Sequence, residues 1–229
     1  IDGLTRSRAL LVQLAQRKLA LATEILDPLA ADYLEDCLSW VAIGARTAES
    51  QIHRQIASRL ACPVGFKNGT DGSVDVAASA IVAARQRHTH LGIDEDGCAA
   101  MRTSSGNPLS HVVLRGGKQG PNYDAESVTR VGQALAKLGL PAQVLVDASH
   151  GNSGKDHNRQ SIVAMEVAAQ LSRSDVDVLG VMIESHVTAG TQPARPDARP
   201  DQSVTDACID FATTERLLED LARASRSRG

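Results

Sequence analysis

Residues 144–156, VLVDASHGNSGKD, begin with a short apolar run, continue to a histidine and end in a polar stretch punctuated by glycine. The apolar run predicts a buried strand over residues 144–150, and the glycines predict a tight turn just beyond it. His150 at a strand end has two interpretations: a hydrogen-bonded structural residue, which is the commoner case, or a ligand. The choice depends on whether other strands of the chain end in the same way.

Short apolar runs alternate along the chain with longer amphipathic stretches. The runs predict six strands, at residues 22–27, 40–45, 64–68, 111–115, 144–150 and 180–186. The stretches around them predict helices at residues 3–20, 31–38, 47–60, 73–86, 124–138, 156–172 and 206–223. Alternation of helices with nearly continuous apolar strands is typical of a parallel sheet covered by helices, so the sequence predicts an α/β fold.

Two segments interrupt this alternation. Residues 91–103 predict a small hairpin before the fourth strand, and the proline-rich residues 188–203 predict a long loop at the active site. Six strands fit an open doubly wound sheet, whereas a closed barrel needs eight strand–helix units in about 250 residues. A chain of 229 residues can bury one substantial core, so residues 1–229 are expected to form a single domain.

The composition excludes several classes of protein. The formal net charge is −3 and no basic stripe stands out, which argues against nucleic acid or an anionic membrane as the main partner. No apolar run approaches the roughly 20 residues that a membrane span needs. The cysteines are widely spaced and none forms a CxxC pair, so we expect reduced thiols and a cytoplasmic protein.

Polar side chains recur where the predicted strands end. In parallel α/β folds, function gathers at the carboxyl ends of the strands. One polar strand end is unremarkable, but a matching series is hard to explain as solvated surface. The series comprises Asp27, Arg46, Lys67, Arg115, Lys118, His150, Glu184 and His186.

Arg46, Lys67 and Arg115 are expected to converge on one rim of the sheet. Such a cluster repels itself unless an anion occupies it, and Arg matches phosphate or carboxylate with two donors. The alternative is that each cation pairs with a nearby carboxylate such as Glu24 or Asp27. Glycines in RGGK and NGTDG favour the anion site because they let backbone N–H groups approach a ligand. Neither phosphate-loop nor dinucleotide fingerprint occurs, so a nucleotide is not expected.

His150, Glu184 and Asp206 form a mixed nitrogen and oxygen set from two strand ends and the final loop. One imidazole with two carboxylates suits a divalent metal such as Mn²⁺, Fe²⁺, Co²⁺ or Zn²⁺. The alternative is a polar network of hydrogen-bonded carboxylates, and spacing alone does not decide between the two.

Five blocks of sequence closely resemble the type I 3-deoxy-D-arabino-heptulosonate 7-phosphate (DAHP) synthases. The blocks are WVAIGARTAESQIHRQIASRLACPVGFKNGTDGS (40–73), HVVLRGGKQGPNY (111–123), LVDASHGNSGKDHNRQ (145–160), GVMIESH (180–186) and VTDACIDF (204–211). They occur in the family's order across essentially the whole chain. The resemblance implies a TIM (β/α)8-barrel, of which only strands three to eight are recognisable here.

The resemblance also implies an activity. Family members are transferases that open the shikimate pathway to aromatic amino acids, condensing phosphoenolpyruvate with erythrose 4-phosphate and releasing phosphate with a divalent metal. By motif, Arg46, Lys67 and Arg115 hold phosphoenolpyruvate, with Lys67 and His150 catalytic and Glu24 helping to position water. His150, Glu184 and Asp206 match three metal ligands. A homo-oligomer and an aromatic amino acid effector are further expectations.

Two family segments are missing. The family's fourth metal ligand is a cysteine in a GPCS-like segment, and a KPRT-like segment supplies further cations; neither occurs in this sequence. Two explanations are open. The chain is the retained part of a longer synthase, which the absence of a starting methionine favours, or it is a short form that acts as a non-catalytic binding or regulatory partner.

Overall fold

In the computed structural model, the fold of the chain is built on a sheet of parallel strands. The structure describes residues 1–94, 96–173 and 177–227. Within these residues the parallel sheet has six strands in the order β1-β2-β3-β6-β7-β8. The prediction of an α/β fold is therefore confirmed, and each predicted strand is present. The strands are β1 (Ala22–Glu24), β2 (Trp40–Ile43), β3 (Val64–Lys67), β6 (His111–Leu114), β7 (Val144–Asp147) and β8 (Val178–Met182).

The chain divides into two compact units. The first consists of Ile1–Gly69 and Asp75–Val112, and the second of Thr70–Val74 and Val113–Gly229. Strand β6 therefore begins in the first unit and ends in the second. The expectation of a single domain over residues 1–229 stays a prediction.

The first unit is built on β1, β2 and β3, which pair in parallel in chain order. Val41 and Ile43 of β2 and Val64 and Phe66 of β3 are fully buried, as expected for strands covered on both faces. The helices are α1 (Asp2–Gln16), α2 (Pro28–Leu34), η1 (Glu35–Cys37), α3 (Gln51–Arg59) and α4 (Asp75–Ala84). Side-chain caps begin α2 and α3: Asp27 Oδ1 accepts a 2.8 Å hydrogen bond from Leu29 N, and Ser50 Oγ accepts one from His53 N.

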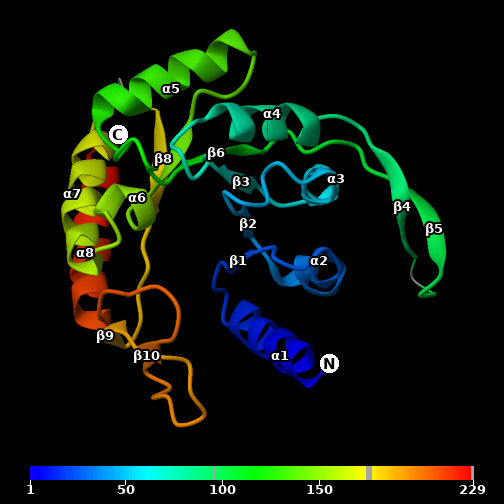
Figure 1. Ribbon diagram of the computed structural model, residues 1–229, viewed down its shortest axis with the longest axis horizontal. Coiled ribbons are helices and arrows are strands. Elements are labelled where there is room, and N and C mark those ends of the chain that lie inside the picture. The colour runs from blue at the N-terminus through cyan, green and yellow to red at the C-terminus, as the bar shows by residue number, and fades with distance from the viewer. Residues whose placement is uncertain (95, 174–176, 228–229) are drawn as a thin grey trace. The chain divides into compact units, whose positions relative to one another are not determined.

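A hairpin extends the first unit. Strands β4 (Thr89–Ile93) and β5 (Ala99–Thr103) pair antiparallel, as Figure 1 shows. The hairpin predicted over residues 91–103 is confirmed, except that β4 begins two residues earlier and that residue 95 lies outside the described residues. Alternate residues of both strands are exposed, so one face of the hairpin is solvated.

The second unit is built on the end of β6 and on β7 and β8, which pair in parallel. Helices α7 and α8 lie side by side (Figure 1), and their core contains Ala164, Ile209 and Leu217 with Val181 and Ile183 packed against it. The helices of this unit are α5 (Ala125–Lys137), α6 (His150–Ser153), η2 (His157–Arg159), α7 (Gln160–Leu171) and α8 (Phe211–Arg226).

Two boundaries differ from the predictions in ways that matter for function. Strand β7 ends at Asp147, three residues early, and His150 instead opens α6 with a positive φ of 52°. The proline-rich segment is not a loop throughout, because its ends form the short parallel pair β9 (Thr188–Thr191) and β10 (Gln202–Ser203). In the described part of the chain, no helix is both long and apolar enough to cross a membrane.

Candidate functional site

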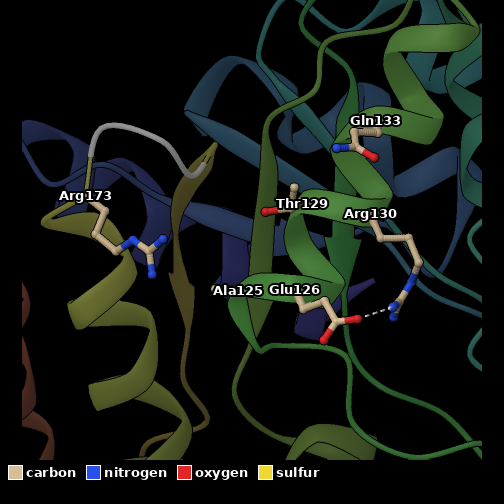
Figure 2. A pocket seen from close by; sticks show the side chains of 6 residues that line it. All are labelled: Ala125, Glu126, Thr129, Arg130, Gln133 and Arg173. Atoms are coloured by element: carbon tan, nitrogen blue, oxygen red, sulfur yellow. Dashed lines mark ion pairs between the residues drawn. The ribbon is translucent and has the colours of Figure 1, made fainter.

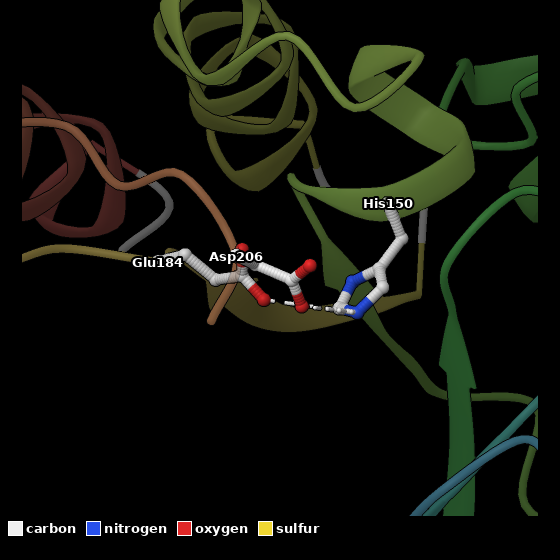
Figure 3. A group of neighbouring side chains, drawn as sticks. All are labelled: His150, Glu184 and Asp206. Carbon is white, nitrogen blue, oxygen red and sulfur yellow. Dashed lines mark ion pairs between the residues drawn. The ribbon is translucent and has the colours of Figure 1, made fainter. Parts of the chain in front are cut away.

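Three side chains of the second unit meet beyond the carboxyl ends of β7 and β8. His150 opens α6, Glu184 follows β8, and Asp206 precedes α8; Figure 3 shows the three pointing toward one another. One ligand atom from each lies within 4.8 Å of the others. His150 Nε2 is 3.7 Å from Glu184 Oε1 and 3.8 Å from Asp206 Oδ2. The structure thus brings together the three residues predicted as metal ligands.

A buried carboxylate lies beside the ring nitrogen of His150 that is not the one nearest Glu184 and Asp206. Asp147 is fully buried, and its Oδ2 lies 3.0 Å from His150 Nδ1. Its other oxygen accepts a 2.9 Å hydrogen bond from Ser149 N. A carboxylate beside Nδ1 favours a proton on that nitrogen and leaves the Nε2 lone pair for a ligand.

Glu184 is held at both its backbone and its side chain. The buried Gln160 accepts a hydrogen bond from Glu184 N at 2.8 Å and donates one to Glu184 O at 3.1 Å. Ser149 Oγ donates a 2.8 Å hydrogen bond to Glu184 Oε2. Burial raises the pKa of the Glu184 carboxyl, against the lowering effects of Ser149 and His150.

The donor set fits a divalent cation. Bonds of about 2.0–2.2 Å place two ligand atoms on one ion roughly 3.0–3.4 Å apart, so the observed separations of 3.7 and 3.8 Å need to close only slightly. Burial, and to a smaller extent the charges of Asp206 and Asp147, raise the pKa of the Glu184 carboxyl, and a bound cation would offset both effects by stabilising the carboxylate. One imidazole nitrogen with carboxylate oxygens suits a borderline-hard metal.

The predicted anion-binding residues fall in both units. Lys67 ends β3 and is buried, with its Nζ 4.0 Å from Glu24 Oε2, so the carboxylate pairing that the sequence left open is present. Arg46 is exposed in the turn after β2. Arg115 follows β6 in the second unit. The convergence of the three cations stays a prediction.

The glycines of RGGK do not offer their N–H groups to a ligand, because Gly116 N donates to Asn122 Oδ1 and Gly117 N to Gly120 O; for NGTDG the expectation stays a prediction. A Cβ on Gly116 would stand 2.5 Å from the Gly151 carbonyl carbon, and one on Gly151 would stand 2.5 Å from Gly117 N. Gly151 N likewise donates to Arg115 O. These glycines therefore let three loops pack backbone against backbone.

A cavity of about 580 Å³ lies in the second unit next to His150. The loops after β3, β6 and β7 form its walls. Its cationic side chains are Arg115, Lys118, Lys155 and Arg159. Arg115 and Lys118 are at predicted strand ends, whereas Lys155 and Arg159 lie several residues beyond one and were not predicted.

A second cavity of about 440 Å³ is lined by one face of α5 and by Arg173, which follows α7 (Figure 2). Glu126 and Arg130, one helical turn apart, form a 3.7 Å ion pair at its edge. None of the predicted site residues lines it. His186, also at a predicted strand end, accepts a hydrogen bond from Val187 N at its Nδ1 and is not part of the three-residue cluster.

Comparison with known proteins gives one consistent family. The model of the DAHP synthetase I family matches residues 3–219. The chain is 45% identical over 99% of its length to a tyrosine-inhibited phospho-2-dehydro-3-deoxyheptonate aldolase of Schizosaccharomyces pombe, of which it covers 62%. It is 46% identical, again over 99% of its length, to the Phe-sensitive enzyme of Escherichia coli, of which it covers 65%. A Trp-sensitive relative from Salmonella typhimurium is 44% identical.

A solved structure supports the same relationship. The phospho-2-dehydro-3-deoxyheptonate aldolase of Francisella tularensis matches all of this chain with a TM-score of 0.95 and 42% identity, and 67% of that protein is covered. The backbone thus follows the fold of that protein throughout. The chain spans just under two thirds of the length of the curated relatives named above.

Proposed function

The chain belongs to the DAHP synthetase I family, and on that premise we propose that it condenses phosphoenolpyruvate with erythrose 4-phosphate to give DAHP and inorganic phosphate. This reaction is the first step of the shikimate pathway to aromatic amino acids. The observation that carries the proposal is the cluster of His150, Glu184 and Asp206, whose ligand atoms lie within 4.8 Å of one another.

Cationic side chains are proposed to bind phosphoenolpyruvate. Arg46, Lys67 and Arg115 bind its phosphate and carboxylate, because ammonium and guanidinium groups offset the charge of these groups. Lys67 suits this role because it is buried and because Glu24, 4.0 Å from its Nζ, is the partner that keeps it oriented. Glu24 also serves to position water near the phosphate.

The metal assigned to the cluster is Mn²⁺, Fe²⁺, Co²⁺ or Zn²⁺. When bound, such an ion supplies a Lewis acid for the aldehyde oxygen of erythrose 4-phosphate. His150 offers Nε2 because Asp147 lies against Nδ1, and Glu184 offers a carboxylate whose backbone Gln160 clamps. These contacts keep the ligands in place before the ion arrives, which lowers the ordering cost of binding.

An aromatic amino acid is proposed as effector, since relatives are named for their sensitivity to phenylalanine, tyrosine or tryptophan. A cavity of about 510 Å³ in the first unit offers suitable chemistry. Its wall combines apolar side chains such as Ile56 with the charged side chains of Arg59, Arg102 and Asp32. Arg102 Nη1 lies 3.5 Å from Asp32 Oδ1. A zwitterion with an apolar side chain matches such a lining.

Loss of phosphoenolpyruvate absorbance in the presence of erythrose 4-phosphate and Mn²⁺ tests the proposal, after the intact mass of the chain has been verified. We expect turnover that a chelator abolishes and that His150→Ala abolishes, while His157→Ala on the same loop retains it. No turnover by a folded chain of verified mass would show that these 229 residues are not an active synthase by themselves.

A further inference from the structure

We propose that the cavity bounded by Lys118, Lys155 and Arg159 is a second anion site, which binds a phosphate group. The cavity has a volume of about 580 Å³ and lies in the second unit. The three residues are distinct from those assigned above to phosphoenolpyruvate, although Arg115 and His150 also border the cavity. Phosphate can reach it as inorganic phosphate or as part of a phosphate ester.

The charge of the lining is the first argument. Four side chains that line the cavity are Lys or Arg, and no Asp or Glu is among its lining residues in the described part of the chain. Within residues 1–94, 96–173 and 177–227, Lys118, Lys155 and Arg159 form no ion pair, whereas Arg8, Arg199 and other surface cations do. Cations gathered around one cavity repel one another, and a bound dianion removes that repulsion.

The rigidity of the walls is the second argument. Lys155 has a left-handed backbone with φ 64°, and its N–H donates a 2.8 Å hydrogen bond to His150 O. Non-glycine residues at positive φ are strained and concentrate at functional sites. In the neighbouring wall Lys118 N donates to Thr70 O at 3.1 Å, which ties the loop after β6 to the loop after β3. The backbone carrying two of the cations is thus fixed before any ligand binds.

The chemistry of the lining selects the ligand. The backbone N–H groups of Gly117, Lys118 and Gly151 are used inside the protein, so the ligand is held by side chains. Ammonium and guanidinium groups from the segments after β6 and β7 suit the oxygens of a phosphate, which project in several directions. Phe, Tyr and Trp are absent from the lining in the part of the chain that the structure describes, so His150 is the one aromatic ring that the described lining offers to a base.

Titration of the chain with inorganic phosphate tests the site without any catalysis. Isothermal titration calorimetry would compare the unmodified chain with a cavity variant, Lys118→Gln, Lys155→Gln and Arg159→Gln. The control variant, Arg6→Gln, Lys18→Gln and Lys137→Gln, changes the net charge equally. Lys18 is a matched control for Lys155 because its φ is 61°. We expect the Kd to rise at least 10-fold in the cavity variant and less than 2-fold in the control.

Equal affinity in the cavity variant, or equal losses in both variants, would overturn the proposal. If the cavity variant does not fold, amide chemical shifts of the unmodified chain locate the bound phosphate instead. We expect phosphate to shift the resonances of residues 116–120 and 151–155. Shifts confined to other residues would contradict the proposed site. Glycerol 2-phosphate distinguishes the sources, since tighter binding than inorganic phosphate identifies an ester site and weaker binding a site for inorganic phosphate. Because binding is read directly, a chain without synthase activity still tests this inference.

Discussion

Replacing Asp147 with asparagine is expected to weaken metal binding while the fold persists. The carboxylate is fully buried, and its Oδ2 lies 3.0 Å from His150 Nδ1. Asparagine has the same shape as aspartate. Its side-chain oxygen can still accept the 2.9 Å hydrogen bond that Ser149 N donates to Asp147 Oδ1. The amide carries no charge, however, and its N–H₂ group can turn toward Nδ1. The ring would then hold its proton on Nε2, the nitrogen that faces Glu184 and Asp206.

The expected loss of affinity is about 10- to 100-fold, the usual effect of removing a group that orients a metal-bound histidine. That range corresponds to about 1.4–2.7 kcal/mol. Competition of the chain with a Mn²⁺-sensitive dye measures the affinity directly. Thermal unfolding without metal, measured alongside, separates a loss of orientation from a loss of fold.

Asp156→Asn provides the matched control, because Asp156 is exposed and carries the same charge on the loop that follows α6. We expect its Mn²⁺ affinity to stay within 2-fold of the unmodified chain. Equal Mn²⁺ affinity in Asp147→Asn and Asp156→Asn would refute the reasoning, since overall charge alone would then account for any effect.

Two further predictions concern stability. Trp40 Nε1 donates a 3.1 Å hydrogen bond to His111 Nε2, and burial lowers the pKa of His111. As the pH falls through about 6.5, His111 is therefore protonated in the unfolded chain but stays neutral in the folded chain. The free energy of unfolding should be greatest above about pH 6.5 and should decrease as the pH drops below it. Urea unfolding, followed through the fluorescence of this single tryptophan, measures the free energy of unfolding at each pH. If the difference in this free energy between the unmodified chain and His111→Gln did not change with pH, the prediction would be contradicted. Gly117→Ala should lower the Tm by several degrees because its methyl group would meet the Gly72 backbone, whereas Gly180→Ala, with open space around it, should change the Tm little; equal Tm values would exclude the proposed loop packing.

Sequence patterns predicted the strands because burial on both faces leaves an apolar run that is visible without a structure. Val144 and Val146 are fully buried, and the run that contains them marks β7. The pattern overran the strand, since Ala148 and Ser149 differ little from strand residues in type. What stops the strand is the turn that Asp147 makes by accepting a hydrogen bond from Ser149 N, two residues on. That contact depends on geometry and leaves no periodic signal.

Site residues differ in the same way: some follow from the sequence pattern, and others depend on geometry alone. His150, Glu184 and Asp206 were predictable because each follows an element of the repeating fold and each carries a side chain that binds metals. Gln160 was not predictable, because a glutamine at the start of a helix has no chemistry that identifies it as a clamp. Its role arises only because α7 packs where Gln160 can bond both backbone groups of Glu184.

The loop that carries His150 connects the proposed metal ligands with the cationic cavity. His150 has a positive φ of 52° and faces the carboxylates through Nε2, while its carbonyl oxygen accepts a hydrogen bond from Lys155 N. Gly151 N anchors the same turn to Arg115 O at 2.9 Å. A strained turn held at both ends has little freedom to move one residue without the others. A cation on the carboxylates lowers the negative charge beside the cavity, so phosphate should bind more tightly after Mn²⁺ has been added than before it. Linkage requires the reciprocal effect of equal size, a tighter Mn²⁺ affinity in phosphate, and unequal factors in the two titrations would contradict binding at two coupled sites.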